Sequence, residues 1–171
     1  MGRLGKIKEG WRIKVDNEIN VFISHAGKDE GQIEKFKTLM TNKKGYHFKD
    51  SSIVESEPNN ATNPDYIKSA YLIPSINWAG TVIVLIGKDT HKSDWVNWEI
   101  EYAMKLGKKV IGVYIYGEKG VTLPSALEDY GSACVGWDSN KIDEAVRGEN
   151  PIWEDEDGNI RDDKTSSRIT C

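Results

Sequence analysis

Residues 81–86, with the sequence Thr-Val-Ile-Val-Leu-Ile, constrain the fold more than any other stretch. They form an unbroken apolar run rich in β-branched side chains, and a glycine stands at each end of it. Such a run predicts a strand that is buried on both faces, and strands of this kind occupy the interior of parallel sheets. We therefore expect residues 81–86 to be a central strand of an α/β protein.

Predicted strands and helices alternate along the rest of the chain. Further strands are predicted at residues 19–24, 46–50, 110–116 and 133–137. Helices are predicted after Asp29, which we expect to be an N-cap, after Asn63-Pro64 with a break at Pro74, and after Ser93, Pro124 and Asn140. This order predicts a flavodoxin-like, three-layer fold, in which a five-stranded parallel sheet of order 2-1-3-4-5 carries helices on both faces.

We expect this domain to span residues 19–147. Residues 1–18 are predicted to be a polar N-terminal extension. Residues 148–171 are acidic and polar, with few apolar side chains to anchor them. They are predicted to form a tail or a small add-on hairpin about Asp157-Gly158.

The predicted helix at 93–107 carries an acid on its apolar face. Ser93 is a good N-cap and Gly107 a plausible stop. A helical wheel places Glu99 inside an apolar arc and Glu101 on the opposite, solvent-facing side; the arc consists of Trp95, Val96, Ile100, Ala103 and Leu106. An inward acid is costly unless it is paired or lines a cavity, so Glu99 is a site candidate. The alternative is that Glu99 reaches the edge of the packed face or pairs with a lysine.

The predicted strand order places this helix beside a ligand-binding crevice. In open α/β sheets, ligands bind at the carboxyl ends of the strands, where the strand order reverses. The loops at residues 24–29 and 87–93 flank that point, and the helix of Glu99 follows the second loop. We therefore expect Glu99 to lie close to the binding crevice.

Composition excludes several classes of function. The chain has 23 basic and 27 acidic side chains, a net charge of −4 and no basic stripe, which argues against nucleic-acid binding. Its two cysteines, Cys134 and Cys171, form no C-x-x-C motif, and no apolar run is long enough to span a membrane, so a cytoplasmic protein is predicted. The histidines, His25, His47 and His91, are scattered, and no metal site is predicted.

Four segments resemble the TIR domain family. They are Phe22-Ile23-Ser24-His25 with Lys28-Asp29, then Phe48-Lys49-Asp50, then residues 81–86, and finally the Ser-x-Trp-x-x-x-Glu element at 93–99. Residues 80–109 resemble most closely the TIR-like branch that includes the TIR subunit of Thoeris antiphage defence. The resemblance covers residues 19–147.

This resemblance implies an activity. Active members of the family cleave NAD+ at the bond between nicotinamide and ribose, and their essential glutamate corresponds to Glu99. The substrate-binding residues implied are Ser24, His25, Gly27, Lys28, Asp50 and Trp95. From the sequence alone, Trp95 is equally well explained as a core residue and His25 as an ordinary loop residue. The chain also departs from many eukaryotic relatives, which carry Tyr or Arg in place of His25 and Cys in place of Val96.

The resemblance further implies that NAD+ is a substrate and that no cofactor is needed. The product is expected to be a cyclic or otherwise modified ADP-ribose, which diffuses to a separate effector protein, and self-association is expected on activation. The principal rival is a non-enzymatic TIR module that self-associates through residues 51–62. A phosphoacceptor receiver and a nucleoside deoxyribosyltransferase are more distant alternatives. The receiver is disfavoured because the first strand ends in Ser-His rather than in an acidic pair.

Overall fold

The computed structural model describes residues 18–52, 63, 65, 68–149 and 152–165. Within them, five parallel strands form one sheet of order β2-β1-β3-β4-β5, which confirms the predicted fold class and strand order. The strands are β1 (Ile19–Ser24), β2 (Tyr46–Asp50), β3 (Thr81–Ile86), β4 (Lys109–Tyr114) and β5 (Ala133–Val135). The first three have the predicted bounds, whereas β4 and β5 each end two residues earlier than expected. Every residue of β3 is buried, as its sequence predicts.

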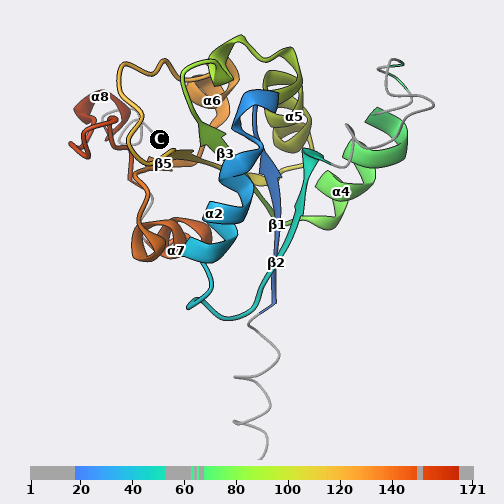
Figure 1. The fold of residues 1–171 in the computed structure, drawn as a ribbon, viewed down its shortest axis with the longest axis horizontal. Coiled ribbons are helices and arrows are strands. Elements are labelled where there is room, and N and C mark those ends of the chain that lie inside the picture. The colour runs from blue at the N-terminus through green and yellow to red at the C-terminus, as the bar shows by residue number, and fades with distance from the viewer. Residues whose placement is uncertain (1–17, 53–62, 64, 66–67, 150–151, 166–171) are drawn as a thin grey trace, which may run out of the picture.

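Helices cover both faces of this sheet (Figure 1). They are α2 (Gly31–Leu39), α4 (Ile73–Trp78), α5 (Asp94–Lys105), α6 (Ser125–Tyr130), α7 (Ser139–Arg147) and α8 (Asp162–Thr165). Side chains of α4, α5 and α6 pack with Val82, Val84 and Ile86 of β3 in one core cluster. Side chains of α2 and α7 pack with Ile83 and Leu85 in the other. Alternate side chains of β3 therefore pack into the two core clusters, because successive side chains of a strand point to opposite faces of the sheet.

Asp29 does not cap α2, contrary to the prediction. It lies in the 3₁₀ turn η1 (Gly27–Asp29), and α2 begins at Gly31 with no side-chain cap. The carboxylate of Asp29 instead accepts a hydrogen bond from the Thr90 hydroxyl, with Oγ1 and Oδ2 3.4 Å apart. A tertiary partner from the loop after β3 has therefore replaced the local capping interaction.

The break or kink predicted at Pro74 is replaced by a change of helix type just before it. Lys68–Leu72 form a π-helical turn, and α4 follows directly from Ile73, with the proline in its first turn. The predicted helix start at Asn63-Pro64 lies mostly outside the described residues, although Oδ1 of Asn63 accepts a hydrogen bond from the Asp65 amide at 3.1 Å.

The described part of the C-terminal segment packs against the edge of the sheet beside β5. Trp153 forms a parallel bridge with Cys134, is 5 % exposed and belongs to the core cluster beneath α6. A bridge between Glu154 and Ile160 closes a small hairpin, with Gly158 at a φ of +86° in its turn. The add-on hairpin expected about residues 157–158 is therefore present. The predicted extension lies outside the described residues except for residue 18, and the predicted domain boundaries stay predictions.

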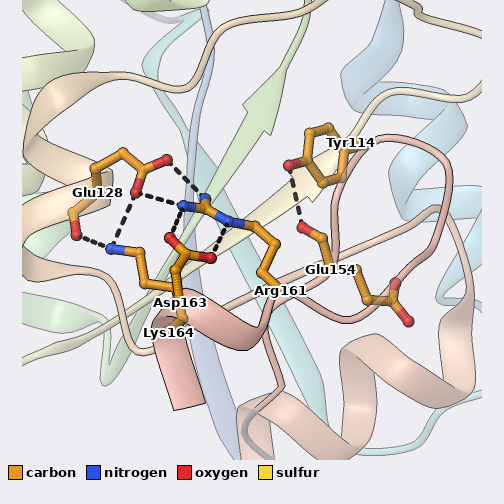
Figure 2. A network of polar contacts seen from close by, with 6 residues as sticks. All are labelled: Tyr114, Glu128, Glu154, Arg161, Asp163 and Lys164. Atoms are coloured by element: carbon orange, nitrogen blue, oxygen red, sulfur yellow. Dashed lines mark hydrogen bonds and ion pairs between the residues drawn. The ribbon is translucent and has the colours of Figure 1, made fainter. Parts of the chain in front are cut away.

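Ion pairs hold this segment to α6. Figure 2 shows the guanidinium of Arg161 between the carboxylates of Glu128 and Asp163, and the ammonium of Lys164 on Glu128. The hydroxyl of Tyr114 donates to the backbone oxygen of Glu154 at 3.1 Å. Among the described residues, no helix combines the length and the apolar character needed to cross a membrane.

Candidate active site

The loops after β1 and β3 contact each other at the carboxyl edge of the sheet. Nζ of Lys28 lies 3.1 Å from Oδ2 of Asp89, and the Asp29 carboxylate meets the Thr90 hydroxyl. A Cβ added to Gly87 would lie 2.8 Å from Oδ2 of Asp29, so a larger residue at this position would displace the Asp29 carboxylate. The two loops expected to flank the point where the strand order reverses are therefore adjacent in the structure.

Helix α5 grows from the second of these loops. The hydroxyl of Ser93 accepts a hydrogen bond from the Val96 amide at 3.2 Å, as expected of an N-cap. Asn97 makes two further hydrogen bonds that the sequence did not suggest. Its Nδ2 donates to the Ser93 carbonyl at 3.1 Å, and its Oδ1 accepts from the Ala126 amide at the start of α6. These bonds fix the first turn of α5, and with it the direction of Glu99.

The carboxyl group of Glu99 is buried. Its residue is 1 % exposed, on the same face of α5 as Val96, Ile100 and Ala103. The hydroxyl of Ser24, buried at the end of β1, donates to Oε2 of Glu99. No lysine pairs with Glu99 in the part of the chain that the structure describes, so that alternative does not hold there. Burial raises the pKa of Glu99 to about 8, although the hydrogen bond from Ser24 opposes this rise.

The wheel misplaces the edge of the apolar arc. Trp95 is 36 % exposed and Leu106 is also exposed, although both were expected to face inward. Lys68 lies over the indole rings of Trp95 and Trp98, 5.7 and 4.9 Å from their centroids. Lys68, Asp94, Trp95 and Trp98 line a surface pocket of about 240 Å³. Trp95 therefore faces a surface pocket and is not a core residue. Glu101 is exposed, as predicted.

The other sequence-derived candidates occupy three different environments. His25 is 7 % exposed, and its Nδ1 lies 2.8 Å from the carbonyl oxygen of Ala26. Gly27 opens the turn η1, and Lys28 is exposed and paired with Asp89. Asp50, at the end of β2, accepts hydrogen bonds from Lys37 Nζ at 3.2 Å and from the Ser52 amide at 3.0 Å. Of the candidate side chains, only Ser24 is bonded directly to Glu99.

No group of three His, Cys, Asp or Glu side chains close enough to hold a metal ion occurs among the described residues. Cys134 is buried and free, and burial raises the pKa of its thiol to about 12.

Comparison with known protein families decides the relationship. A family model described as "Thoeris protein ThsB, TIR-like domain" matches residues 22–120, which include the second half of β1, all of β2, β3 and β4, and the whole of α5. The chain belongs to this family. The membership of the ThsB TIR-like family confirms the resemblance drawn from the sequence. The matched residues include both loops and Glu99. No curated protein matches the chain in sequence.

Three solved structures resemble the chain at low sequence identity, and the first of them shares its fold. A conserved protein from Enterococcus faecalis V583 is 10 % identical, with a TM-score of 0.53, and the match covers 78 % of this chain and 99 % of that one. The TIR domain of the Toll-related receptor TRR-2 from Hydra magnipapillata is 14 % identical, with a TM-score of 0.47 and coverages of 75 % and 92 %. The CMP N-glycosidase BcmB from Clostridium botulinum is 20 % identical, with a TM-score of 0.43 and coverages of 76 % and 97 %.

Proposed function

We propose that this ThsB TIR-like protein is an enzyme that consumes NAD+ by cleaving the bond between nicotinamide and ribose. The observation that carries the proposal is Glu99, an acid without an ion-pair partner among the described residues, held in the interior at the carboxyl ends of β1 and β3. Buried acids are costly, and those with strongly raised pKa values concentrate at functional sites. Membership of the TIR-like family supports NAD+ as the substrate.

The reaction requires few catalytic groups besides such a carboxylate. The C–N bond breaks, its electron pair leaves with neutral nicotinamide, and the ribose carbon accepts a new pair from water or from another group of the nucleotide. Positive charge develops on the ribose, and a carboxylate in a water-poor site stabilises it, as in glycoside hydrolysis. The nicotinamide ring of NAD+ is itself cationic, and a nearby positive charge lowers the pKa of a carboxyl group. Substrate binding would therefore ionise Glu99 where the free enzyme holds it protonated.

The product and its use follow from the family relationship. We infer that the enzyme releases a cyclic or otherwise modified ADP-ribose in the cytoplasm, where it signals to a separate effector in antiphage defence. Self-association on activation belongs to the same proposal. The match to the Thoeris family supports this assignment.

The test is nicotinamide release from NAD+, followed by chromatography, with the purified protein and with extract of phage-infected cells added as activator. We expect Glu99→Gln to lower the rate at least 100-fold, the scale of losing a main electrostatic contact. Glu101→Gln is the matched control: it lies two residues away, is exposed and should leave the rate unchanged. Release that survives Glu99→Gln and is lost in Glu101→Gln would refute the assignment. Absence of release from the activated wild type, together with concentration-dependent self-association, would favour the interaction module.

A further inference from the structure

Two indole rings and an ammonium group meet at the surface pocket beside α5. Nζ of Lys68 lies 5.7 Å from the ring centroid of Trp95 and 4.9 Å from that of Trp98. These three residues and Asp94 line the pocket, whose volume is about 240 Å³. Of the four residues, only Trp95 was indicated by the sequence motifs, and the structure adds the other three.

The charge of Lys68 is held by the rings and not by an acid. Within the ranges that the structure describes, neither Lys68 nor Asp94 has an ion-pair partner, although both line the same pocket. The ammonium instead lies over the two indole rings, within the distance of about 6 Å at which the negative face of an aromatic ring attracts a cation. The pocket therefore already binds one positive charge through its aromatic rings.

One wall of this pocket is held in place by its own packing. The ring of Trp98 stacks on that of Tyr102, with centroids 5.2 Å apart and an angle of 11° between the planes. Both side chains also pack against the core cluster beneath α5. Because the ring of Trp98 is ordered before any ligand arrives, little conformational freedom remains to be lost when a flat group binds against it.

Lys68 projects from an uncommon helical turn. It is the first residue of the π-helical turn that precedes α4. In a continuous α-helix the ring of Pro74 would clash with the carbonyl group of residue 70, which accounts for a wider turn before it. π-helical turns are rare, and they occur frequently at functional sites. The position of Lys68 over the rings therefore depends on a turn that the sequence itself specifies.

We propose that the two indole rings and Asp94 form a binding site for a planar organic cation. The ammonium of Lys68 is the internal group that such a ligand displaces. A flat cationic ring stacks on indole, and its charge is attracted both by the rings and by the carboxylate of Asp94. A neutral ring gains the stacking alone. That the natural ligand is the cationic nicotinamide ring of NAD+ rests on the proposed function, and Lys68 then lowers the affinity of the free enzyme for its substrate.

N-methylnicotinamide, methylated on the ring nitrogen, tests the site without any reaction, because its cationic ring carries no ribose. The indole ¹H–¹⁵N resonances, assigned with Trp95→Phe and Trp98→Phe variants, are followed while it is added. We expect both resonances to move until the site is saturated. Nicotinamide, the same ring without the charge, is the matched control ligand and should bind about fivefold more weakly. Unmoved resonances, or the same Kd for the two ligands, would overturn the proposal.

Lys68→Met tests the role of the lysine, because methionine keeps most of the side-chain length and has no charge. The Kd for N-methylnicotinamide should fall about fivefold once the internal competitor is lost. Lys105→Met removes the same charge from the exposed last turn of α5 and should leave the Kd unchanged. A wild-type Kd in a folded Lys68→Met variant, or an equal fall in both variants, would overturn the proposal.

The wild-type protein reports the displacement even where Lys68→Met does not fold. The ring currents of the two indoles shift the ε-methylene resonances of Lys68, and these should return to the ordinary lysine position as N-methylnicotinamide binds. Resonances that stay in place at saturation would overturn the proposal.

The cation site and the proposed reaction can fail separately. Saturable binding of N-methylnicotinamide to a protein that never releases nicotinamide from NAD+ would support the cation site and contradict the reaction. Release of nicotinamide by a protein that does not bind N-methylnicotinamide would overturn the cation site and support the reaction.

Discussion

The pH dependence of folding stability tests the environment of Glu99 without requiring any enzymatic activity. Burial raises the pKa of this carboxyl group from 4.5 to about 8. Between these values the folded protein holds a proton that the unfolded chain has released. The free energy of unfolding therefore falls as the pH rises. Glu99→Gln places a neutral amide of nearly the same size at the position, and so removes this contribution.

The magnitude follows from the size of the pKa difference. One pKa unit corresponds to about 1.4 kcal/mol, so the full shift corresponds to a penalty of roughly 5 kcal/mol. The contribution of Glu99 to the free energy of unfolding is most favourable below pH 4.5, the pKa of the group in the unfolded chain. It falls as the pH rises, and above about pH 8 the whole penalty of roughly 5 kcal/mol applies. Between about pH 5 and pH 7, the wild type should lose about 2.5 kcal/mol relative to Glu99→Gln.

Urea denaturation at a series of pH values measures this difference. The effects of all other titrating groups cancel in the comparison of wild type with Glu99→Gln, provided that the two proteins share a denaturant slope. Glu101→Gln serves as the control, since Glu101 is exposed on the other side of α5 and its variant should follow the wild-type curve. Parallel curves for wild type and Glu99→Gln from pH 5 to pH 8 would refute the argument, because they would show that Glu99 is solvated or already ionised.

Three shorter predictions concern the site and the packing around it. The kcat/KM for NAD+ should rise with pH, with the midpoint of the rise near pH 8. Ser24→Ala should move that midpoint upward, because the hydrogen bond from Ser24 lowers the pKa of Glu99; an unmoved midpoint would contradict this. Gly112→Ala should cost about 1–3 kcal/mol by denaturant unfolding, since its Cβ would lie 2.7–2.9 Å from three core side chains, whereas Gly31→Ala meets nothing within 4 Å. Trp153→Ala should cost about 3–5 kcal/mol, and a loss below about 1 kcal/mol would mean that the C-terminal hairpin contributes little to the fold.

Much of the fold could be predicted because its signals are local. The unbroken run at residues 81–86, rich in β-branched side chains, has few conformations open to it other than a buried strand, and β3 has those bounds. The N-cap at Ser93 and the periodicity behind it likewise define α5 and bury Glu99. The burial of this acid depends only on its phase relative to Val96, Ile100 and Ala103, which helical geometry determines.

What could not be predicted depends on partners far apart in the chain. Asp29 has the residue type of an N-cap, but Thr90, from the loop after β3, binds its carboxylate instead. Trp95 lies at the edge of the apolar arc, where the position of a neighbour such as Lys68 decides whether the indole is buried in the core or lies at the surface. Lys68 itself belongs to no motif, and its position over the two indole rings became visible only once its turn and α5 were placed together.

The burial of Glu99 has opposite consequences for stability and for function. A neutral side chain at this position would spare the fold the cost of ionising an acid in its interior, so above about pH 8 Glu99→Gln should be the more stable protein. The same low-polarity surroundings strengthen the attraction between a carboxylate and a developing positive charge, which is what cleavage of NAD+ requires. A Glu99→Gln variant that is more stable and also inactive would therefore indicate an acid kept for its chemistry. If the variant were more stable and released nicotinamide at the wild-type rate, Glu99 would destabilise the fold without contributing to the reaction, and the proposed mechanism would fail.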